Sequence, residues 1–251
     1  MPSLAAFIPA RSGSQRVKNK NIRILGEYPL IAYTIAQART AGCFSSVIVS
    51  TDCEKISEIA KKYGAEVPEL RPAKFAQSTS PDIEWIQHLL KFLESETRLP
   101  DAFSLLRPTS PFRRPETINK AWESFKNTSG VDSLRAVEKC LQHPGKMWVI
   151  REGRLVPILP FGDPPWHSSQ YQTLPEVFVQ NASLEIAWSR IPLEKGTIAG
   201  STVMPWISEE YDGFDINTID DWNTSERLLA SGDVKISKNI ESFLKSCPQQ
   251  S

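Results

Sequence analysis

The fold is decided by an apolar stretch near the N-terminus, residues 4–8, which reads L-A-A-F-I and is followed by Pro9. A short run without a charged residue is typical of a parallel strand that is buried on both faces. Pro9 ends the hydrogen-bond ladder because proline has no N–H to donate. A loop rich in Gly, Ser and basic residues follows directly. The sequence therefore predicts a strand that delivers this loop to one edge of a sheet.

Strands and helices alternate outward from this stretch. Further strands are predicted at residues 47–49, 66–67, 102–106 and 133–137. Apolar side chains at helical spacing predict helices from Pro29 to Gly42, from Asp52 to Gly64, from Pro81 through Leu93 and from Pro115 through Phe125. Asp52 is expected to cap its helix, and Gly42 to end the first one. This alternation predicts an α/β fold with a doubly wound, mostly parallel sheet.

The alternation stops after Val137. Residues 138–175 are rich in Pro, Gly, His and Trp and hold only short extended pieces, so we expect a small inserted lobe. The core is expected to resume over residues 177–188, with another strand at 202–206. Thr218 has the capping-box spacing that opens a last main helix through about Ala230. The tail from residue 235 to 251 is expected to be peripheral.

The composition is globular and excludes several classes of protein. The 251 residues include 29 Lys+Arg and 29 Asp+Glu, with 40% apolar and 23% charged residues. A formal net charge of zero argues against a general nucleic-acid-binding surface. No apolar run approaches the roughly 20 residues that span a membrane. Residues 1–9 lack the basic and apolar regions of a secretory signal.

The four cysteines have no C-x-x-C spacing, so a zinc site is not expected. Without an export signal, they are expected to be reduced thiols in a cytoplasmic protein.

The positive charge is concentrated in one loop. Residues 11–23, R-S-G-S-Q-R-V-K-N-K-N-I-R, carry five cations and no acid. Gly13 and the flanking serines allow tight turns whose N–H groups form an anion-binding nest, and the cations add charge where a polyphosphate would lie. A solvated basic loop is the alternative. The position after the first strand favours a nucleoside triphosphate site. Because neither G-x-x-x-x-G-K-[ST] nor G-x-G-x-x-G is present, P-loop ATPases and NAD enzymes are disfavoured.

Four motifs in a fixed order resemble those of a known family. They are I-P-A-R-S-G-S-Q-R with K-N-K-N-I in residues 8–22, L-R-P-A-K-F-A in residues 70–76, R-P-T-S-P-F-R in residues 107–113 and D-I-N-T in residues 215–218. Together they resemble the signature of the acylneuraminate cytidylyltransferases, also called CMP-sialic acid synthetases. The resemblance runs over about residues 5–230. It implies one nucleotidyltransferase-type domain over residues 1–251.

The resemblance also implies a reaction. The anomeric hydroxyl of a 2-keto sugar acid would attack the α-phosphate of CTP, release pyrophosphate and form a CMP-sugar, with Mg²⁺ assisting. CTP and the sugar acid would be the partners, without nucleic acid or membrane, and the inserted lobe at 138–175 would make a homodimer. Such transfer depends mainly on positioning and charge stabilisation, which a loop of fixed cations supplies.

Site residues are assigned from the loop and the resemblance together. The expected nucleotide-binding residues are Arg11, Ser12, Gly13, Ser14, Arg16, Lys20, Asn21 and Arg71. The expected sugar-acid contacts are Arg107, Thr109, Ser110, Gln180 and Asn181. Catalysis is expected to depend on Arg11, Lys20 and Asp215, and the metal on Asp215 and Asn217. Lys20 as a solvated lysine, Arg71 in a surface ion pair and Asn181 as a buried hydrogen-bonding residue are the alternatives.

The chain departs from the family pattern in three of the motifs. Gln15 and Arg16 stand where the family usually has Lys-Gly, so Arg16 is expected to replace the lysine with a different reach. Asn217 replaces an aspartate, which predicts that Mg²⁺ arrives mainly with CTP; Asp215 merely ordering its loop is the alternative. Arg107 replaces a glutamine that faces the sugar. It predicts a sugar acid that differs from N-acetylneuraminic acid, for example a pseudaminic- or legionaminic-type relative, unless Arg107 pairs with a nearby acid and touches no substrate.

Two other functions stay open on the sequence alone. The substituted positions, Gln15 and Asn217, are compatible with a non-catalytic nucleotide-binding relative. A glycosyltransferase that uses a nucleotide sugar normally carries D-x-D at a strand end. The nearest stretch here, residues 51–54, reads T-D-C-E and fits poorly.

Overall fold

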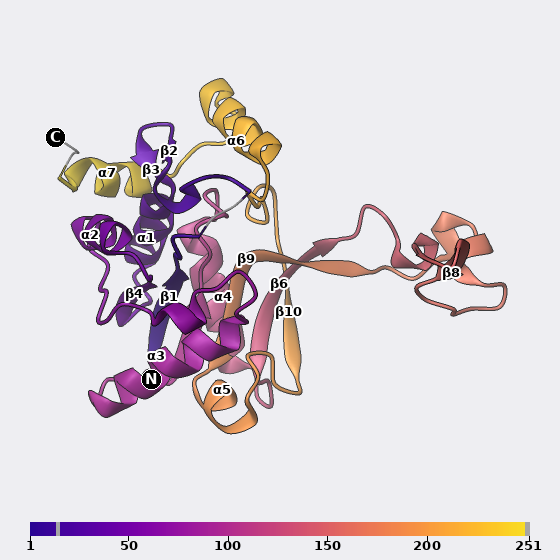
Figure 1. Cartoon of the computed structure of the whole chain (residues 1–251), viewed down its shortest axis with the longest axis horizontal. Coiled ribbons are helices and arrows are strands. Elements are labelled where there is room, and N and C mark those ends of the chain that lie inside the picture. The colour runs from indigo at the N-terminus through magenta and orange to yellow at the C-terminus, as the bar shows by residue number, and fades with distance from the viewer. Residues whose placement is uncertain (14–15, 249–251) are drawn as a thin grey trace. The chain divides into compact units, whose positions relative to one another are not determined.

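The predicted N-terminal strand lies inside a six-stranded sheet (Figure 1). The structure, a computed structural model, describes residues 1–13 and 16–248. Strand β1 (Leu4–Pro9) pairs in parallel with β4 (Ser46–Ser50) on one side and with β5 (Ala102–Leu105) on the other. The strand order is β10-β6-β9-β5-β1-β4. The α/β prediction with a mostly parallel sheet is confirmed.

One strand breaks the parallel pattern. β9 (Phe178–Trp188) runs antiparallel to β5 and places Glu185 opposite Leu105. The remaining sheet strands are β6 (Ser133–Lys139) and β10 (Val203–Ile207). The predicted strand at residues 66–67 is reduced to one parallel bridge between Glu66 and Ile48. The reversed strand matters for the site because it brings a carboxylate from late in the chain to the end of β5.

The two faces of β1 face different parts of the core. Leu4, Ala6 and Ile8 join the cluster that contains the apolar side chains of α1 and α4, whereas Ala5 and Phe7 join the cluster formed with α3. This alternation follows from the period of two in a strand, and it explains why all five residues are apolar. The main helices are α1 (Leu30–Ala41), α2 (Glu54–Lys62), α3 (Asp82–Ser95), α4 (Pro115–Asn127), α5 (Arg190–Lys195), α6 (Ile219–Ser231) and α7 (Lys238–Ser246).

Helix boundaries follow the predicted signals with one error. Gly42 ends α1 in the left-handed region, at φ 73°, and Thr218 and Asp221 form a complete capping box on α6. Asp52 does not cap α2, because Cys53 is the N-cap residue and has no side-chain cap hydrogen bond. The Asp52 carboxylate accepts hydrogen bonds from Ser12 instead. A long-range partner therefore replaces the local cap.

The prediction of a peripheral tail is also wrong. Residues 238–246 form α7, and its Ile240 and Leu244 are buried in the main core cluster with α1. Their spacing of four places both side chains on one helical face. Ser237 caps the helix by accepting a hydrogen bond from the Ile240 N–H.

The chain divides into two compact units. The first unit comprises residues 1–136 and 181–251, and the second comprises Val137–Gln180, which contains the predicted lobe at 138–175. The second unit holds the antiparallel hairpin of β7 (Trp148–Arg151) and β8 (Arg154–Pro157), with exposed apolar side chains such as Ile150 and Leu155. Smaller elements are β2 (Ile24–Leu25), β3 (Tyr28–Pro29) and the 3-10 turns η1 (Lys20–Ile22), η2 (Ala73–Phe75), η3 (Pro144–Lys146), η4 (Trp166–Ser168) and η5 (Tyr171–Thr173).

Within the described residues, no helix combines the length and the apolar character needed to cross a membrane. The four cysteines are free thiols.

Candidate functional site

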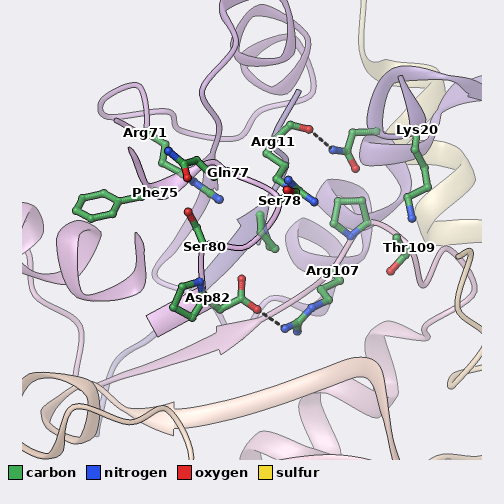
Figure 2. Close-up of a pocket in the computed structure, with 14 residues that line it drawn as sticks. Arg11, Lys20, Arg71, Phe75, Gln77, Ser78, Ser80, Asp82, Arg107 and Thr109 are labelled. Atoms are coloured by element: carbon green, nitrogen blue, oxygen red, sulfur yellow. Dashed lines mark hydrogen bonds and ion pairs between the residues drawn. The ribbon is translucent and has the colours of Figure 1, made fainter. Parts of the chain in front are cut away.

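A cavity of about 390 Å³ lies in the first unit at the carboxyl ends of β1 and β5, the edge at which the sequence predicts a ligand (Figure 2). It is lined by Pro9, Arg11, Lys20, Asn21, Arg71, Phe75, Gln77, Ser78, Ser80, Pro81, Asp82, Arg107, Pro108 and Thr109. Among these described lining residues, Asp82 is the sole carboxylate against four basic side chains. The cavity is therefore suited to an anionic ligand.

The end of the basic loop is fixed by a left-handed turn at Asn19. Asn19 has φ 54°, a conformation that asparagine tolerates better than most residues, and η1 begins directly after it. The turn presents Lys20 to the cavity and buries Asn21, whose Nδ2 donates to the Arg11 carbonyl oxygen at 3.0 Å. Asn21 therefore ties the two ends of the loop together, so that Arg11 and Lys20 reach the same cavity.

The start of the loop is held by Asp52. The Ser12 N–H donates to Oδ1 of Asp52 at 2.8 Å, and the Ser12 hydroxyl donates to Oδ2 at 2.7 Å. Ser12 lines a smaller neighbouring cavity of about 130 Å³ rather than the main one. An anion that binds the Ser12 N–H would have to displace the Asp52 carboxylate.

The other predicted loop residues lie around this point. Gly13 does not line the cavity, and a Cβ built on it would meet Arg11 at an ordinary 3.8 Å. Arg16 is exposed and does not line the cavity either. Ser14 and Gln15 lie outside the described residues.

Lys20 connects the basic loop to the predicted metal loop. Its Nζ donates to the Ile216 carbonyl oxygen at 2.6 Å, and the Ile216 N–H donates to the Thr109 carbonyl oxygen at 2.9 Å. Burial lowers the pKa of Lys20 below its ordinary value. The Asp215 charge raises that pKa, and the charges of Arg16 and Arg11 lower it further. Lys20 is thus a half-buried cation whose surroundings disfavour its charge until an anion arrives.

Arg71 is a buried wall of the cavity. Its Nε donates to the Ser50 hydroxyl and its Nη2 to the Ser50 carbonyl oxygen, both at 2.9 Å. Its guanidinium carbon lies 4.5 Å from the ring centroid of Trp85. Burial lowers the pKa of Arg71 to about 10, which still leaves it charged at neutral pH. The predicted alternative of a surface ion pair does not describe this buried side chain.

Arg107 lines the cavity and is paired with two acids. Its Nη2 lies 2.6 Å from Oδ2 of Asp82, and its Nη1 lies 2.6 Å from Oε1 of Glu185. Glu185 is also paired with Arg135 through its other oxygen. Burial alone would lower the pKa of Arg107, but the carboxylates of Glu185 and Asp82 raise it above its ordinary value. Arg107 therefore pairs with nearby acids, as one alternative predicts, and also lines the cavity.

A second arginine supports the Arg107 backbone from inside the core. Arg113 is buried, and its Nη2 donates to the Arg107 carbonyl oxygen at 3.1 Å. Its Nη1 donates to Oε1 of Gln37 at 2.8 Å, and its Nε donates to the Ser183 carbonyl oxygen. Burial lowers the pKa of Arg113 to about 9. Its guanidinium therefore fixes three segments without contacting the cavity.

The predicted metal ligands contact each other. Nδ2 of Asn217 donates to Oδ2 of Asp215 at 2.6 Å, while Oδ1 of Asp215 is buried without a hydrogen-bond partner among the described residues. The described residues contain no group of three or more His, Cys, Asp or Glu side chains placed to hold a metal ion. One unpartnered carboxylate oxygen beside a carbonyl-bearing amide fits Mg²⁺, which prefers oxygen ligands and takes most of them from water or substrate phosphates.

Two predicted sugar-acid contacts in the first unit, Ser110 and Asn181, do not line the cavity. Ser110 is fully buried. Asn181 donates from Nδ2 to the Ser208 hydroxyl at 2.9 Å and accepts at Oδ1 from the Ser183 N–H. Gln180 is the last residue of the second unit, so its predicted sugar contact stays a prediction.

One wall of the cavity, which follows Arg71 in the chain, was not predicted from the sequence. Phe75, Gln77, Ser78, Ser80 and Asp82 all line the cavity, and Figure 2 shows them on the same segment. The available signal was the L-R-P motif directly before them, together with an acid at the start of a helix. In the sequence, that acid indicates only a helix start.

Comparison with known proteins places these features in context. The sequence model described as cytidylyltransferase matches residues 5–143. A CMP-N,N'-diacetyllegionaminic acid synthase of Legionella pneumophila is 35% identical over 231 residues, which cover 90% of this chain and 96% of the relative. A pseudaminic acid cytidylyltransferase of Campylobacter jejuni is 34% identical over 119 residues, 47% of this chain and 51% of the relative.

A solved structure shares the fold at low sequence identity. A CMP:2-keto-3-deoxy-manno-octonic acid synthetase, solved in complex with CTP, superimposes with a TM-score of 0.68 at 13% identity and covers 92% of this chain and 99% of its own. At this identity the likeness concerns the fold alone.

Proposed function

Because the chain belongs to the cytidylyltransferase family, as its motifs predict, we propose that it couples CTP to a 2-keto sugar acid. The anomeric oxygen of the sugar acid forms a bond to the α-phosphorus of CTP. The bond from that phosphorus to the bridging oxygen of the β-phosphate breaks, pyrophosphate leaves, and the hydroxyl proton is released. The products are a CMP-sugar, pyrophosphate and one proton.

The observation that carries the proposal is the convergence of cations on one cavity. Arg11, Lys20, Arg71 and Arg107 come from three segments of the chain and line the same space. Arg11 and Lys20, which the Asn21 contact holds together, are suited to the triphosphate. Arg107 and Thr109, which follow strand β5 and line the same cavity, are suited to the sugar acid.

The sugar acid is proposed to be a nonulosonic acid. The Legionella and Campylobacter relatives carry legionaminic and pseudaminic acids in their names. Arg107 supports this class because its guanidinium keeps N–H donors for substrate hydroxyl or acyl groups after pairing with two acids.

Mg²⁺ is the proposed cofactor. Asp215 and Asn217 would hold it, and the ion would neutralise charge on the phosphates when bound. The chain's own residues bring the metal loop and the basic loop together, because Lys20 donates to the Ile216 carbonyl oxygen between the two ligands.

The proposed assembly is a homodimer, and the proposed location is the cytoplasm. Exposed apolar side chains in the second unit, among them Leu141, Ile150 and Leu155, support an interface there.

A pyrophosphate-release assay tests the function. The chain is incubated with Mg²⁺, one of the four nucleoside triphosphates and a panel of sugar acids that includes N,N'-diacetyllegionaminic and pseudaminic acids. We expect release with CTP and a nonulosonic acid only. A chain that binds CTP but releases no pyrophosphate with any acid of the panel would instead support the non-catalytic alternative.

A further inference from the structure

We propose that Trp85 and Asp82 form a positioning pair that orients Arg107 on the sugar-acid side of the cavity. The pair lies at the start of α3 and contacts two of the cavity's arginines, Arg71 and Arg107. The inference rests on the proposed function and names the residues that would control its second substrate.

Trp85 is locked in the core. It is 2% exposed, belongs to the cluster that contains Phe7, and its ring lies 6.5 Å from the Phe7 ring. It does not line the cavity. Any influence that it has on a substrate must therefore act through its neighbours.

The two polar contacts of Trp85 use different parts of the indole. The guanidinium of Arg71 lies over the ring face at 4.5 Å, and Nε1 donates to Oδ1 of Asp82 at 2.8 Å. The face of an indole is electron-rich and its N–H edge is electron-poor, so a cation on the face and a carboxylate at the edge both match its charge distribution. One rigid ring thus fixes the position of Arg71 relative to Asp82.

Asp82 connects Trp85 to Arg107. Its second oxygen, Oδ2, pairs with Nη2 of Arg107, which is visible across the cavity in Figure 2. With Oδ1 held by Trp85, the carboxylate cannot rotate to offer both oxygens to the arginine. Arg107 is therefore held between Asp82 and Glu185 with its remaining donors directed by that geometry. Arg71 also makes two hydrogen bonds to Ser50 that do not involve Asp82.

Two substitutions separate the contacts. Trp85→Phe keeps a ring face for Arg71 but removes the donor to Asp82. Asp82→Asn keeps an acceptor for Trp85 but removes the negative charge beside Arg107. In both variants we expect the KM for the preferred sugar acid to rise about fivefold or more, since a charge-assisted contact is lost, while the KM for CTP stays within about twofold. Trp85→Leu removes the ring face as well, so both KM values should rise.

The matched control is Trp122→Phe. Trp122 is a buried tryptophan of α4 that also lies under a cation, Lys126, but it does not line the cavity. This variant should leave both KM values unchanged. Thermal melting establishes that each variant is folded, and Asp82→Asn carries the test if Trp85→Phe does not fold.

The outcomes are distinct. Folded Trp85→Phe and Asp82→Asn variants that match the wild type, or that raise both KM values equally, would overturn the inference while the proposed function stands. A wild-type chain that releases no pyrophosphate with any acid of the panel would overturn the proposed function, and the inference with it.

Discussion

Lys20 on the basic-loop side of the cavity and Arg107 on the other side have opposite electrostatic surroundings. On the basic-loop side, the Lys20 ammonium donates to a main-chain carbonyl, and burial lowers its pKa. On the other side, Arg107 is clamped between two carboxylates that raise its pKa. An under-compensated cation gains most from a polyanion, whereas a neutralised arginine offers oriented donors more than net charge. This difference supports the proposal that the triphosphate binds on the basic-loop side and the sugar acid on the Arg107 side.

The largest expected effect tests the under-compensated side. Lys20→Ala and Arg11→Ala should each lower turnover by at least about tenfold, because a lost charge-assisted contact to phosphate is worth more than about 1.4 kcal/mol. Steady-state pyrophosphate release at saturating sugar acid measures this. Lys18→Ala is the matched control, since Lys18 belongs to the same loop but is exposed and does not line the cavity. Near-normal rates in both pocket variants would remove the phosphate role from this loop.

A smaller effect is expected on the compensated side. Arg107→Gln should raise the KM for the preferred sugar acid by about fivefold and change the ranking of acids in the panel, because an oriented donor is lost. Arg98→Gln is the control, because Arg98 makes an exposed ion pair with Glu66 and neither residue lines the cavity. An unchanged ranking of acids would show that Arg107 serves only the ion-pair network.

The pH dependence of kcat/KM for CTP tests whether Lys20 is the under-compensated cation. Burial lowers the pKa of Lys20 in the free enzyme below the ordinary lysine value of 10.5, so the ammonium loses its charge at a lower pH than a solvated lysine does. The profile of kcat/KM for CTP should therefore fall on the alkaline side with an apparent pKa below 10.5, because kcat/KM reports groups of the free enzyme. Lys20→Arg should move this fall to higher pH. An identical alkaline limb in that variant would assign the titration to another group.

The smallest effect concerns the metal loop. Asn217→Asp adds a carboxylate beside Asp215 and should tighten Mg²⁺ binding by the CTP-free protein roughly fivefold, because ligand charge governs affinity at oxygen sites. Calorimetric titration with Mg²⁺ measures this. Wild-type protein that binds Mg²⁺ tightly without CTP would contradict the prediction that the metal arrives mainly with the nucleotide.

The sequence predicted local features better than long-range ones. The apolar run of β1, the Gly42 stop of α1 and the Thr218 capping box depend on neighbouring residues and are confirmed. Asp52 failed as a cap because its true partner, Ser12, lies 40 residues away. The tail failed because two apolar residues on α7, Ile240 and Leu244, are enough to dock it on the core.

The candidate site divides in the same way. Arg11, Lys20, Asn21, Arg71, Arg107 and Thr109 were named from motifs and line one cavity. The carboxylates that pair with Arg107 were not predicted. Glu185 reaches Arg107 only because β9 runs antiparallel to β5, and Asp82 reaches it across the cavity. Neither ion pair can be predicted from the spacing of these residues in the sequence.

The most direct test of the two-sided account measures both KM values in two variants side by side. The account predicts that Lys20→Ala raises the KM for CTP more than that for the sugar acid, and that Arg107→Gln does the reverse. An Arg107→Gln variant that raises the KM for CTP as much as Lys20→Ala does would contradict the proposal that the two substrates bind on different sides of the cavity.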